Sequence, residues 1–244
     1  MSQLALALDA EISTRHLSFL ETGRSAPSRD MVLRLSRHLD LPLRERNILL
    51  SAAGYAPVFP ERRLDDPALA AARHAVELVL EAHRPFPALA VDRHWNLVAQ
   101  NAVVDLLLDG VAPKLLAGPV NVLRLSLHPE GLAQRIVNLG AWRAHLLERL
   151  GRQIEASGDA VLMALRAELD SFGPRPPGRS LRCADDPMIV VPLELGTPGG
   201  VLRFLSTTTV FGTPLDVTLA ELAIEAFFPA DVATGDTLRR MARA

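Results

Sequence analysis

The sequence predicts an α+β protein in two parts, an all-helical N-terminal bundle followed by a domain of antiparallel strands and helices. Up to residue 55, apolar residues recur every three or four positions, which is the spacing of amphipathic helices. From residue 188 onward, β-branched residues alternate in stretches separated by glycine and proline, as in antiparallel strands. With 49% hydrophobic and 22% charged residues among 244, the chain can bury a sizeable core in one or two domains.

Residues 2–24 are predicted to form two short helices joined by a tight turn. Ser2 and Ser13 occupy N-cap positions, where a hydroxyl accepts from free N–H groups of the first turn, and Gly23 can adopt the left-handed conformation that ends a helix. The second helix presents small, hydrogen-bonding or basic side chains outward: Thr14, Arg15, Ser18 and Phe19. Such a face suits a helix that enters the major groove of DNA, and an ordinary pair of surface helices is the alternative.

Residues 2–54 resemble the Xre-type, phage-repressor-like helix-turn-helix regulators. The resemblance rests on a glutamine that opens the first helix, a serine cap, a Leu-Glu-x-Gly close and a proline-containing link. By position, it implies that Thr14, Arg15, Ser18 and Phe19 face DNA bases. It implies that phosphates are held by Gln3, Ser13, Thr22 and Arg24, and helix N-termini do favour phosphate.

Regulators of this type usually have one more helix before the glutamine-led helix, and Met1 leaves no room for it in this sequence. We expect its absence to expose the apolar side chains of Leu4, Leu8 and Leu17. DNA binding by this chain is then expected to be weakened.

The charge distribution adds weak support for DNA binding. The net charge is −2, yet residues 1–63 carry nine arginines against seven acidic residues. Since affinity for DNA follows the number of phosphates neutralised, a single bundle with so little positive charge is expected to bind poorly. We therefore expect a homodimer on double-stranded DNA.

Two further helices complete the predicted bundle. The first follows the cap residue Ser28 and ends near residue 39. The second covers residues 43–53, with Ile48, Leu49 and Ala52 on its inner side.

The bundle is followed by a segment rich in proline and charge, residues 56–66, which is typical of a linker. Beyond it the pattern changes from purely helical to mixed. We therefore expect a helix-turn-helix domain at residues 1–55, a linker at 56–66 and a second domain at 67–244.

The second domain is expected to begin with a helix at residues 68–81 and a hairpin of two strands at 87–92 and 95–100. Asn101 is expected to cap a helix at 102–108. A PAS-like sensor domain begins with this order of elements. Helices are then expected at residues 121–127, 132–137, 139–156, 160–170 and 234–242, and antiparallel strands at 188–195, 201–211 and 218–228.

From about residue 64 the chain resembles the MmyB-like ligand-binding domains that often follow Xre-type bundles. The resemblance is carried by Val91-Asp92-Arg93-His94-Trp95-Asn96, Ala99-Gln100-Asn101, residues 121–125 and the helix that bears Trp142. It implies a PAS-like fold with a mainly apolar pocket, and a fatty-acid-like ligand in some relatives.

Five residues are candidates for binding such a small apolar ligand. Trp95 and Trp142 could line the pocket, although a buried tryptophan is more often core packing. Arg143 could hold a ligand carboxylate, and a solvated helix face is its alternative explanation. His128 lies in a turn that could face the pocket, and Asn101 belongs to one of the family-like motifs.

No enzyme, metal or cofactor chemistry is expected. The seven histidines lack metal-ligand spacing, the single Cys183 has no CxxC partner, and no glycine-rich phosphate loop occurs. No apolar run reaches membrane-spanning length and no signal peptide opens the chain, so we expect a cytoplasmic protein without a membrane partner. The predicted function is a ligand-responsive transcription regulator; the alternative is a ligand-binding or dimerisation protein that no longer binds DNA.

Overall fold

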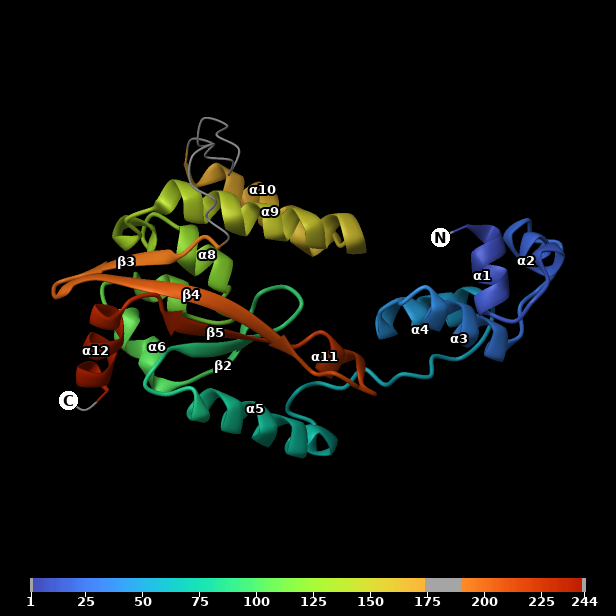
Figure 1. Cartoon of the computed structure of the whole chain (residues 1–244), viewed down its shortest axis with the longest axis horizontal. Helices are drawn as coiled ribbons and strands as arrows, with labels where there is room; N and C mark the ends of the chain where they lie inside the picture. The colour runs from blue at the N-terminus through green and yellow to red at the C-terminus, as the bar shows by residue number, and fades with distance from the viewer. Residues whose placement is uncertain (1, 174–189, 243–244) are drawn as a thin grey trace. The chain divides into compact units, whose positions relative to one another are not determined.

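The computed structural model describes residues 2–173 and 190–242, and these residues fold into two compact units (Figure 1). Unit 1 contains Met1–Leu69 together with Phe211–Glu221, and unit 2 contains Ala70–Val210 and Leu222–Ala244. Cys183 and the first two residues of the strand expected at 188–195 lie outside the described residues.

Unit 1 begins with four helices: α1 (Gln3–Asp9), α2 (Thr14–Glu21), α3 (Arg29–His38) and α4 (Leu43–Ala52). The predicted caps are confirmed, because Ser2, Ser13 and Ser28 each accept a hydrogen bond from the backbone N–H three residues later. Gly23 is left-handed (φ +71°), as its position after α2 predicts. The all-helical start of the chain is thus confirmed.

The inner side of α4 differs from the prediction. Ile48 and Leu49 are 54% and 40% exposed and Ala52 is also exposed, whereas Leu50 is fully buried. The side chain of Asn47 explains this orientation. Its Oδ1 accepts from the backbone N–H groups of residues 58 and 59, and its Nδ2 donates to the Phe59 carbonyl. The helix is therefore turned so that an asparagine, rather than an apolar pair, faces the segment that follows the bundle.

Leucines of the first two helices are buried to different extents. Leu4 and Leu8 are 60% and 69% exposed, as expected. Leu17 is only 3% exposed, so the expectation that it would be uncovered is wrong. Leu17 shares the core of unit 1 with Ala7 and Val32, which are also buried.

Unit 2 is built on a five-stranded antiparallel sheet. Its strands are β1 (Ala88–Val91), β2 (Leu97–Gln100), β3 (Leu193–Thr197), β4 (Gly200–Val210) and β5 (Ala223–Pro229), in the spatial order β2-β1-β5-β4-β3. The first and last hairpins of the sequence lie on its two sides and β5 joins them. This arrangement confirms the predicted α+β class and its PAS-like second domain.

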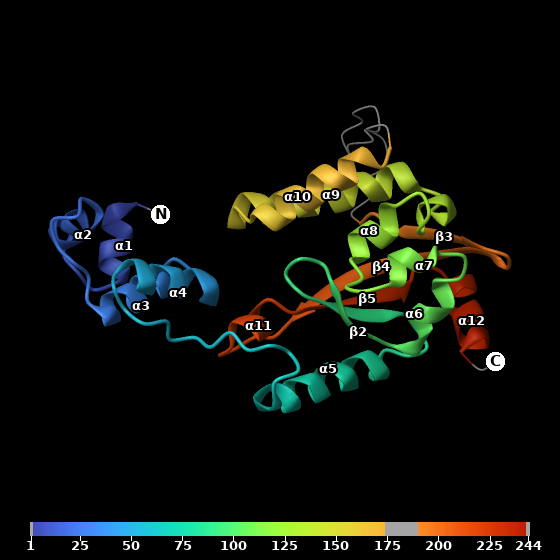
Figure 2. The same ribbon diagram turned by 180° about the vertical axis from the view of Figure 1, so that it is seen from behind.

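Helices cover both faces of this sheet (Figures 1 and 2). One side is covered by α5 (Ala70–Ala82), which follows the short 3₁₀ turn Pro67–Leu69, and the other by α9 (Leu139–Ser157) and α10 (Ala160–Ser171). The remaining helices are α6 (Ala102–Leu107), α7 (Pro113–Leu116), α8 (Val122–Leu127) and α12 (Val232–Met241). Asn121 and Asp159 cap α8 and α10 through their side-chain oxygens.

Three segments of unit 2 and its connections depart from the predicted elements. Residues 218–222 are not strand, because Asp216 caps a short helix, α11 (Val217–Ala220), before β5 begins. Trp95 does not start a strand; it is left-handed (φ +67°), since the Asp92 carboxylate accepts from the N–H groups of residues 94 and 96 and prolongs the turn. Residues 132–137 contain only the 3₁₀ turn Ala133–Arg135, after which Ile136 pairs with Leu195.

Candidate ligand cavity and DNA-binding surface

A cavity of about 110 Å³ lies in unit 2 between the sheet and the helices α6, α8 and α9. Its walls are mainly apolar because strands and helices both turn their buried sides toward it. Six of the larger wall residues are Leu89, Trp95, Leu107, Leu123, Trp142 and Phe204. All but Leu89 are less than one-tenth exposed, so the walls form part of the domain core.

Both predicted tryptophans line this cavity, and both have their indole N–H groups satisfied. Trp95 Nε1 donates to Gln153 Oε1 at 2.9 Å, and Trp142 Nε1 donates to Ser126 Oγ at 3.0 Å. With these groups paired, the rings are free to present apolar surface to the cavity.

The polar part of the wall centres on an ion pair between α9 and β5. Arg149 donates to the two carboxylate oxygens of Glu225 at 2.6 and 3.1 Å and to Thr208 Oγ1 at 2.8 Å. Its guanidinium also lies 4.5 Å from the centre of the Trp95 ring. Glu225 is only 4% exposed, so its charge depends on Arg149 for compensation.

His145 lies one helical turn before Arg149 and stacks on Trp142, with ring centroids 5.6 Å apart. Burial and the positive charge of Arg149 both disfavour the imidazolium, and they lower the pKa of His145 below its ordinary value. The ring next to the cavity wall is therefore neutral near pH 7.

The other three predicted ligand residues are not part of the cavity wall. Asn101 holds backbone together: its amide donates to the Leu80 and Phe86 carbonyls, and its Oδ1 accepts from the Ala88 N–H. It stands at the N-cap position of α6, but its side chain makes no capping bond, so that part of the prediction is wrong. A buried amide with three backbone partners has a structural role here.

His128 and Arg143 also find their partners elsewhere. His128 Nδ1 accepts from the Glu130 N–H, and its ring meets Phe172 edge-on at 4.9 Å. Arg143, only 6% exposed, donates to the Asp170 carbonyl at 3.2 Å. It therefore packs α9 against α10.

Sequence reasoning missed Gln100 and Glu225 as wall residues. Strand pairing places Gln100 opposite Leu89, and Leu89 opposite Glu225, so the three form one row across the sheet. Gln100 belongs to one of the family-like motifs, but its position opposite Leu89 depends on the register of the strands. Alternation within one strand says which residues share a face, and it does not say which strands are neighbours.

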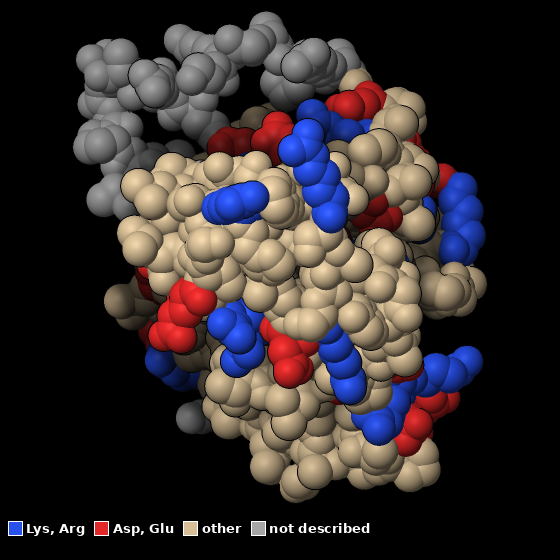
Figure 3. Space-filling view, turned by 90° about the vertical axis from the view of Figure 1, so that its right-hand side faces the viewer, with Lys and Arg blue, Asp and Glu red and all other residues tan. Residues whose placement is uncertain are grey.

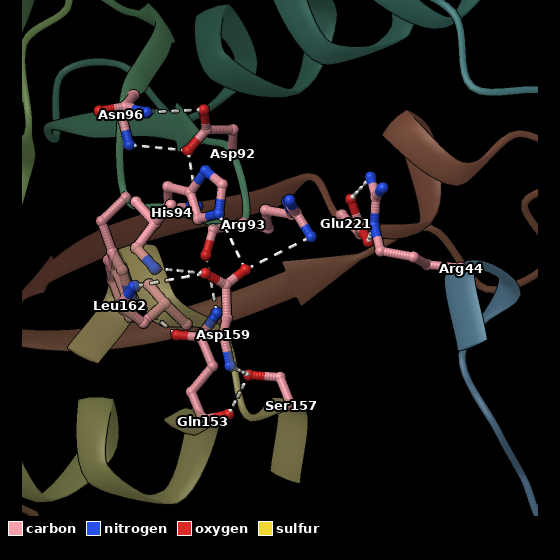
Figure 4. A network of polar contacts seen from close by, with 12 residues as sticks. Arg44, Asp92, Arg93, His94, Asn96, Gln153, Ser157, Asp159, Leu162 and Glu221 are labelled. Atoms are coloured by element: carbon pink, nitrogen blue, oxygen red, sulfur yellow. Dashed lines mark hydrogen bonds and ion pairs between the residues drawn. The ribbon is translucent and has the colours of Figure 1, made fainter. Parts of the chain in front are cut away.

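A second polar network joins the β1–β2 turn to the start of α10 (Figure 4). His94 Nε2 lies 3.0 Å and Arg93 Nη1 3.4 Å from the Asp159 carboxylate, which also accepts from the Val161 N–H at 2.8 Å. Burial disfavours the charged carboxylate, but the hydrogen bonds from His94 and Val161 outweigh it and lower the pKa of Asp159. These contacts fix the turn that carries Trp95.

In unit 1 the predicted base-contacting residues lie on α2. Thr14 and Arg15 are exposed, while Ser18 and Phe19 are partly buried. The Arg15 guanidinium lies 5.3 Å from the centre of the Phe19 ring, which holds the arginine along the helix surface. All four belong to one short helix, so the structure brings them together on one surface.

The predicted phosphate contacts surround this helix. Gln3 and Ser13 begin α1 and α2, and Thr22 and Arg24 follow the end of α2. In the free protein Gln3 donates to Glu21, and the Thr22 hydroxyl donates to the Ser18 carbonyl.

The angle between α1 and α2 is held by their turn and by α3. Glu11 is left-handed (φ +53°), and the Ile12 N–H donates to the Ala7 carbonyl. Arg34 of α3 donates to the Ala10 carbonyl at 3.1 Å. The second helix is thus supported in a defined position relative to the first.

Positive and negative charges are mixed on the face of the molecule shown in Figure 3. The face shown in Figure 3 carries scattered Lys, Arg, Asp and Glu side chains on a mainly uncharged surface, without a continuous basic area. This agrees with the small charge excess of residues 1–63.

Unit 1 also contains the connection between β4 and β5. Arg44 of α4 binds Glu221 with two hydrogen bonds of 2.7 and 2.9 Å (Figure 4). It binds Glu61 as well. These two carboxylates raise the pKa of Arg44 above its ordinary value. Arg62 pairs with Asp216 at 3.1 Å, so the connection is held by two ion pairs.

A DNA-reading helix pair joined to a PAS-like domain with an apolar cavity defines a class of ligand-binding regulators. Family comparison agrees: residues 1–46 match the helix-turn-helix family, and residues 72–241 match the MmyB-like transcription regulator ligand binding domain. The chain therefore belongs to the MmyB-like transcription regulators and is a DNA-binding transcription regulator with a ligand-binding domain. No curated protein matches the sequence.

Within residues 2–173 and 190–242, no helix is long and apolar enough to cross a membrane. The same part of the chain holds no group of three or more His, Cys, Asp or Glu side chains placed to bind a metal ion.

Proposed function

We propose that this protein binds a specific DNA site as a homodimer and responds to a small, mainly apolar ligand in the cavity of unit 2. The observation that carries the proposal is the apolar cavity inside the domain core, lined by two tryptophans, ten leucines and two phenylalanines. A protein core is normally packed without spaces of this size, so the cavity is a candidate binding site.

The size of the cavity limits the ligand. A buried apolar cavity of about 150 Å³ is known to accept benzene, so about 110 Å³ suits a short aliphatic chain or a small ring. A fatty acid with a long chain, which the family resemblance favours, fits only when the walls move apart. The length of the aliphatic chain that the cavity accepts therefore depends on how far its walls can move.

The strands that form the wall also lead to the DNA-binding unit. Phe204 of β4 and Glu225 and Phe227 of β5 line the cavity, and the segment that connects these strands, Phe211–Glu221, belongs to unit 1. In unit 1 this segment is bound by Arg44. A ligand that shifts β4 or β5 can therefore bias unit 1 through the chain itself, provided that it prefers one of two arrangements.

On the DNA side, we propose that Thr14, Arg15, Ser18 and Phe19 read bases. Gln3, Ser13, Thr22 and Arg24 are proposed to hold phosphates. The mixed surface charge supports dimerisation, because two helix-turn-helix units neutralise more phosphates than one. A two-fold dimer then predicts a pseudo-palindromic site with half-sites about 34 Å apart, one helical turn.

The test combines two measurements on the purified full chain. A site selected from random double-stranded DNA is footprinted, and thermal unfolding is recorded with straight-chain alcohols and fatty acids of increasing length. We expect a two-fold symmetric footprint and a rise in melting temperature that depends on chain length, because a ligand that binds only the folded state stabilises it. An asymmetric single half-site and no shift with any ligand would contradict the proposal.

A further inference from the structure

One polar group in the cavity wall lacks a partner. Gln100, the last residue of β2, lines the cavity and donates from Nε2 to Asp105 Oδ1 at 2.5 Å. Its Oε1 is buried and accepts no hydrogen bond from any described residue. A buried acceptor left unpaired costs free energy, so a molecule in the cavity whose donor reaches this oxygen would gain affinity.

The neighbouring carboxylate fixes which end of the amide is unpaired. An ionised carboxylate can only accept hydrogen bonds, so the NH₂ group of Gln100 has to face Asp105. Turning the amide round would put two acceptors in contact. The oxygen therefore remains the unpaired end, and a ligand that meets it must supply a donor.

The charge of the cavity wall points away from an anionic ligand. Arg149 is the one cationic residue of the wall within the described part of the chain, and it already binds both oxygens of Glu225 and the hydroxyl of Thr208. A ligand carboxylate would have to displace a buried glutamate from its partner. Near Gln100 it would instead meet the negative charge of Asp105.

Strand register places these groups at the two ends of one row. Gln100, Leu89 and Glu225 lie opposite one another on β2, β1 and β5. Neighbouring strands are about 4.8 Å apart, so the backbones of Gln100 and Glu225 are separated by roughly 10 Å across an apolar residue. A molecule lying over Leu89 can thus contact Gln100 with a polar end and keep its apolar part among the leucines and tryptophans.

We propose that the cavity selects an uncharged, mainly apolar molecule with a hydroxyl or N–H group that donates to Gln100 Oε1. An aliphatic alcohol or primary amide has this chemistry, whereas an ionised fatty acid does not. The inference rests on the ligand role proposed above and specifies the polar end of the ligand.

The experiment compares three six-carbon probes on the full chain by isothermal titration. Hexanol carries the donor; methyl pentyl ether has the same atoms without a donor; and hexanoate is charged. We expect hexanol to bind about fivefold more tightly than the ether, the effect of one neutral hydrogen bond, and hexanoate to bind most weakly. Gln100→Leu should remove the preference for hexanol over the ether. Gln134→Leu, the same change at an exposed glutamine, should keep it.

The outcomes separate the two proposals. Equal binding of hexanol and ether, tighter binding of hexanoate, or an unchanged preference in Gln100→Leu overturns the assignment of Gln100 but keeps the cavity as a ligand site. Absence of binding by all three probes overturns both. Should Gln100→Leu fail to fold, the comparison of the three probes on the unaltered chain still decides, because it needs no variant.

Discussion

The two units hold their candidate functional side chains in different ways. In unit 1 the side chains proposed to contact bases lie together on one short helix, α2, and the serine cap of that helix holds its first turn. In unit 2 the candidate ligand-binding side chains surround a cavity, and its wall is formed by all five strands and three helices. A substitution on an exposed helix face removes one contact and leaves the fold intact. A substitution in a buried wall can leave a charge unpaired, and it then lowers the stability of the whole domain.

The largest effect is expected where a buried charge is left alone. Replacing Arg149 by Leu leaves Glu225 without its counter-ion and should lower the free energy of unfolding by about 3 kcal/mol, as for other buried pairs. Urea unfolding of the full chain measures it. The double variant Arg149→Leu with Glu225→Leu should recover most of the loss; an equal loss in both variants would show that packing, rather than charge, is responsible.

On the exposed helix, a single change should affect DNA binding without affecting folding. Replacing Arg15 by Ala should cost about 1–3 kcal/mol at the selected site and relax the preference for one base pair, if the arginine reads a base. Replacing Arg24 by Ala should weaken binding to all sequences and reduce the slope of log affinity against log salt by about one. Indistinguishable behaviour of the two variants in salt titrations would refute the division into base and phosphate contacts.

The segment Phe211–Glu221 allows the two units to be tested together. Arg44→Gln removes the ion pair with Glu221 and should leave ligand binding and ligand-free DNA binding nearly unchanged. The change in DNA affinity caused by ligand, typically about 1–3 kcal/mol in coupled systems, should shrink. Arg63→Gln serves as the control, because it removes the ion pair between Arg63 and Asp65, which is exposed to solvent. A full ligand effect in Arg44→Gln would mean that the signal does not pass through this segment.

The smallest effect concerns pH. The pKa of His145 is lowered in the folded protein by burial and by Arg149, so the unfolded chain takes up the proton first as the pH falls. Stability contributed by the neutral ring is therefore complete above about pH 6.5, the ordinary histidine value, and is lost as the pH falls through the lower folded pKa. His145→Gln should flatten the curve of unfolding free energy against pH below 6.5. If the curves of the variant and the unaltered chain are parallel, His145 does not contribute to the pH dependence.

Much of the fold could be predicted from the sequence because its signals are local. Capping serines, the left-handed Gly23 and the alternation of β4 depend on a few neighbouring residues, and they predicted the bundle and the antiparallel sheet. The phase of α4 was missed because Asn47 bonds backbone eleven and twelve residues away. The strand expected at 218–228 begins only at Ala223, because the Asp216 side chain caps a short helix before it.

The cavity shows why site residues are harder to predict than elements. The two tryptophans were found because large aromatic side chains beside apolar runs are conspicuous in a sequence. Gln100 and Glu225 gain their importance from β1, which lies between their strands, and from Arg149 on α9. Arg143 was chosen instead of Arg149 because both lie on the same long helix, and only packing shows which of them faces the sheet.

The most direct test of the regulator is the DNA affinity of the full chain with and without ligand. Hexanol is titrated into the protein alone and into its complex with the selected DNA, and DNA is titrated into protein with and without saturating hexanol. Linkage requires both pairs of affinities to change by the same factor, and we predict a factor of at least about five. Identical DNA affinities in the presence of a ligand that demonstrably occupies the cavity would contradict a ligand-responsive regulator.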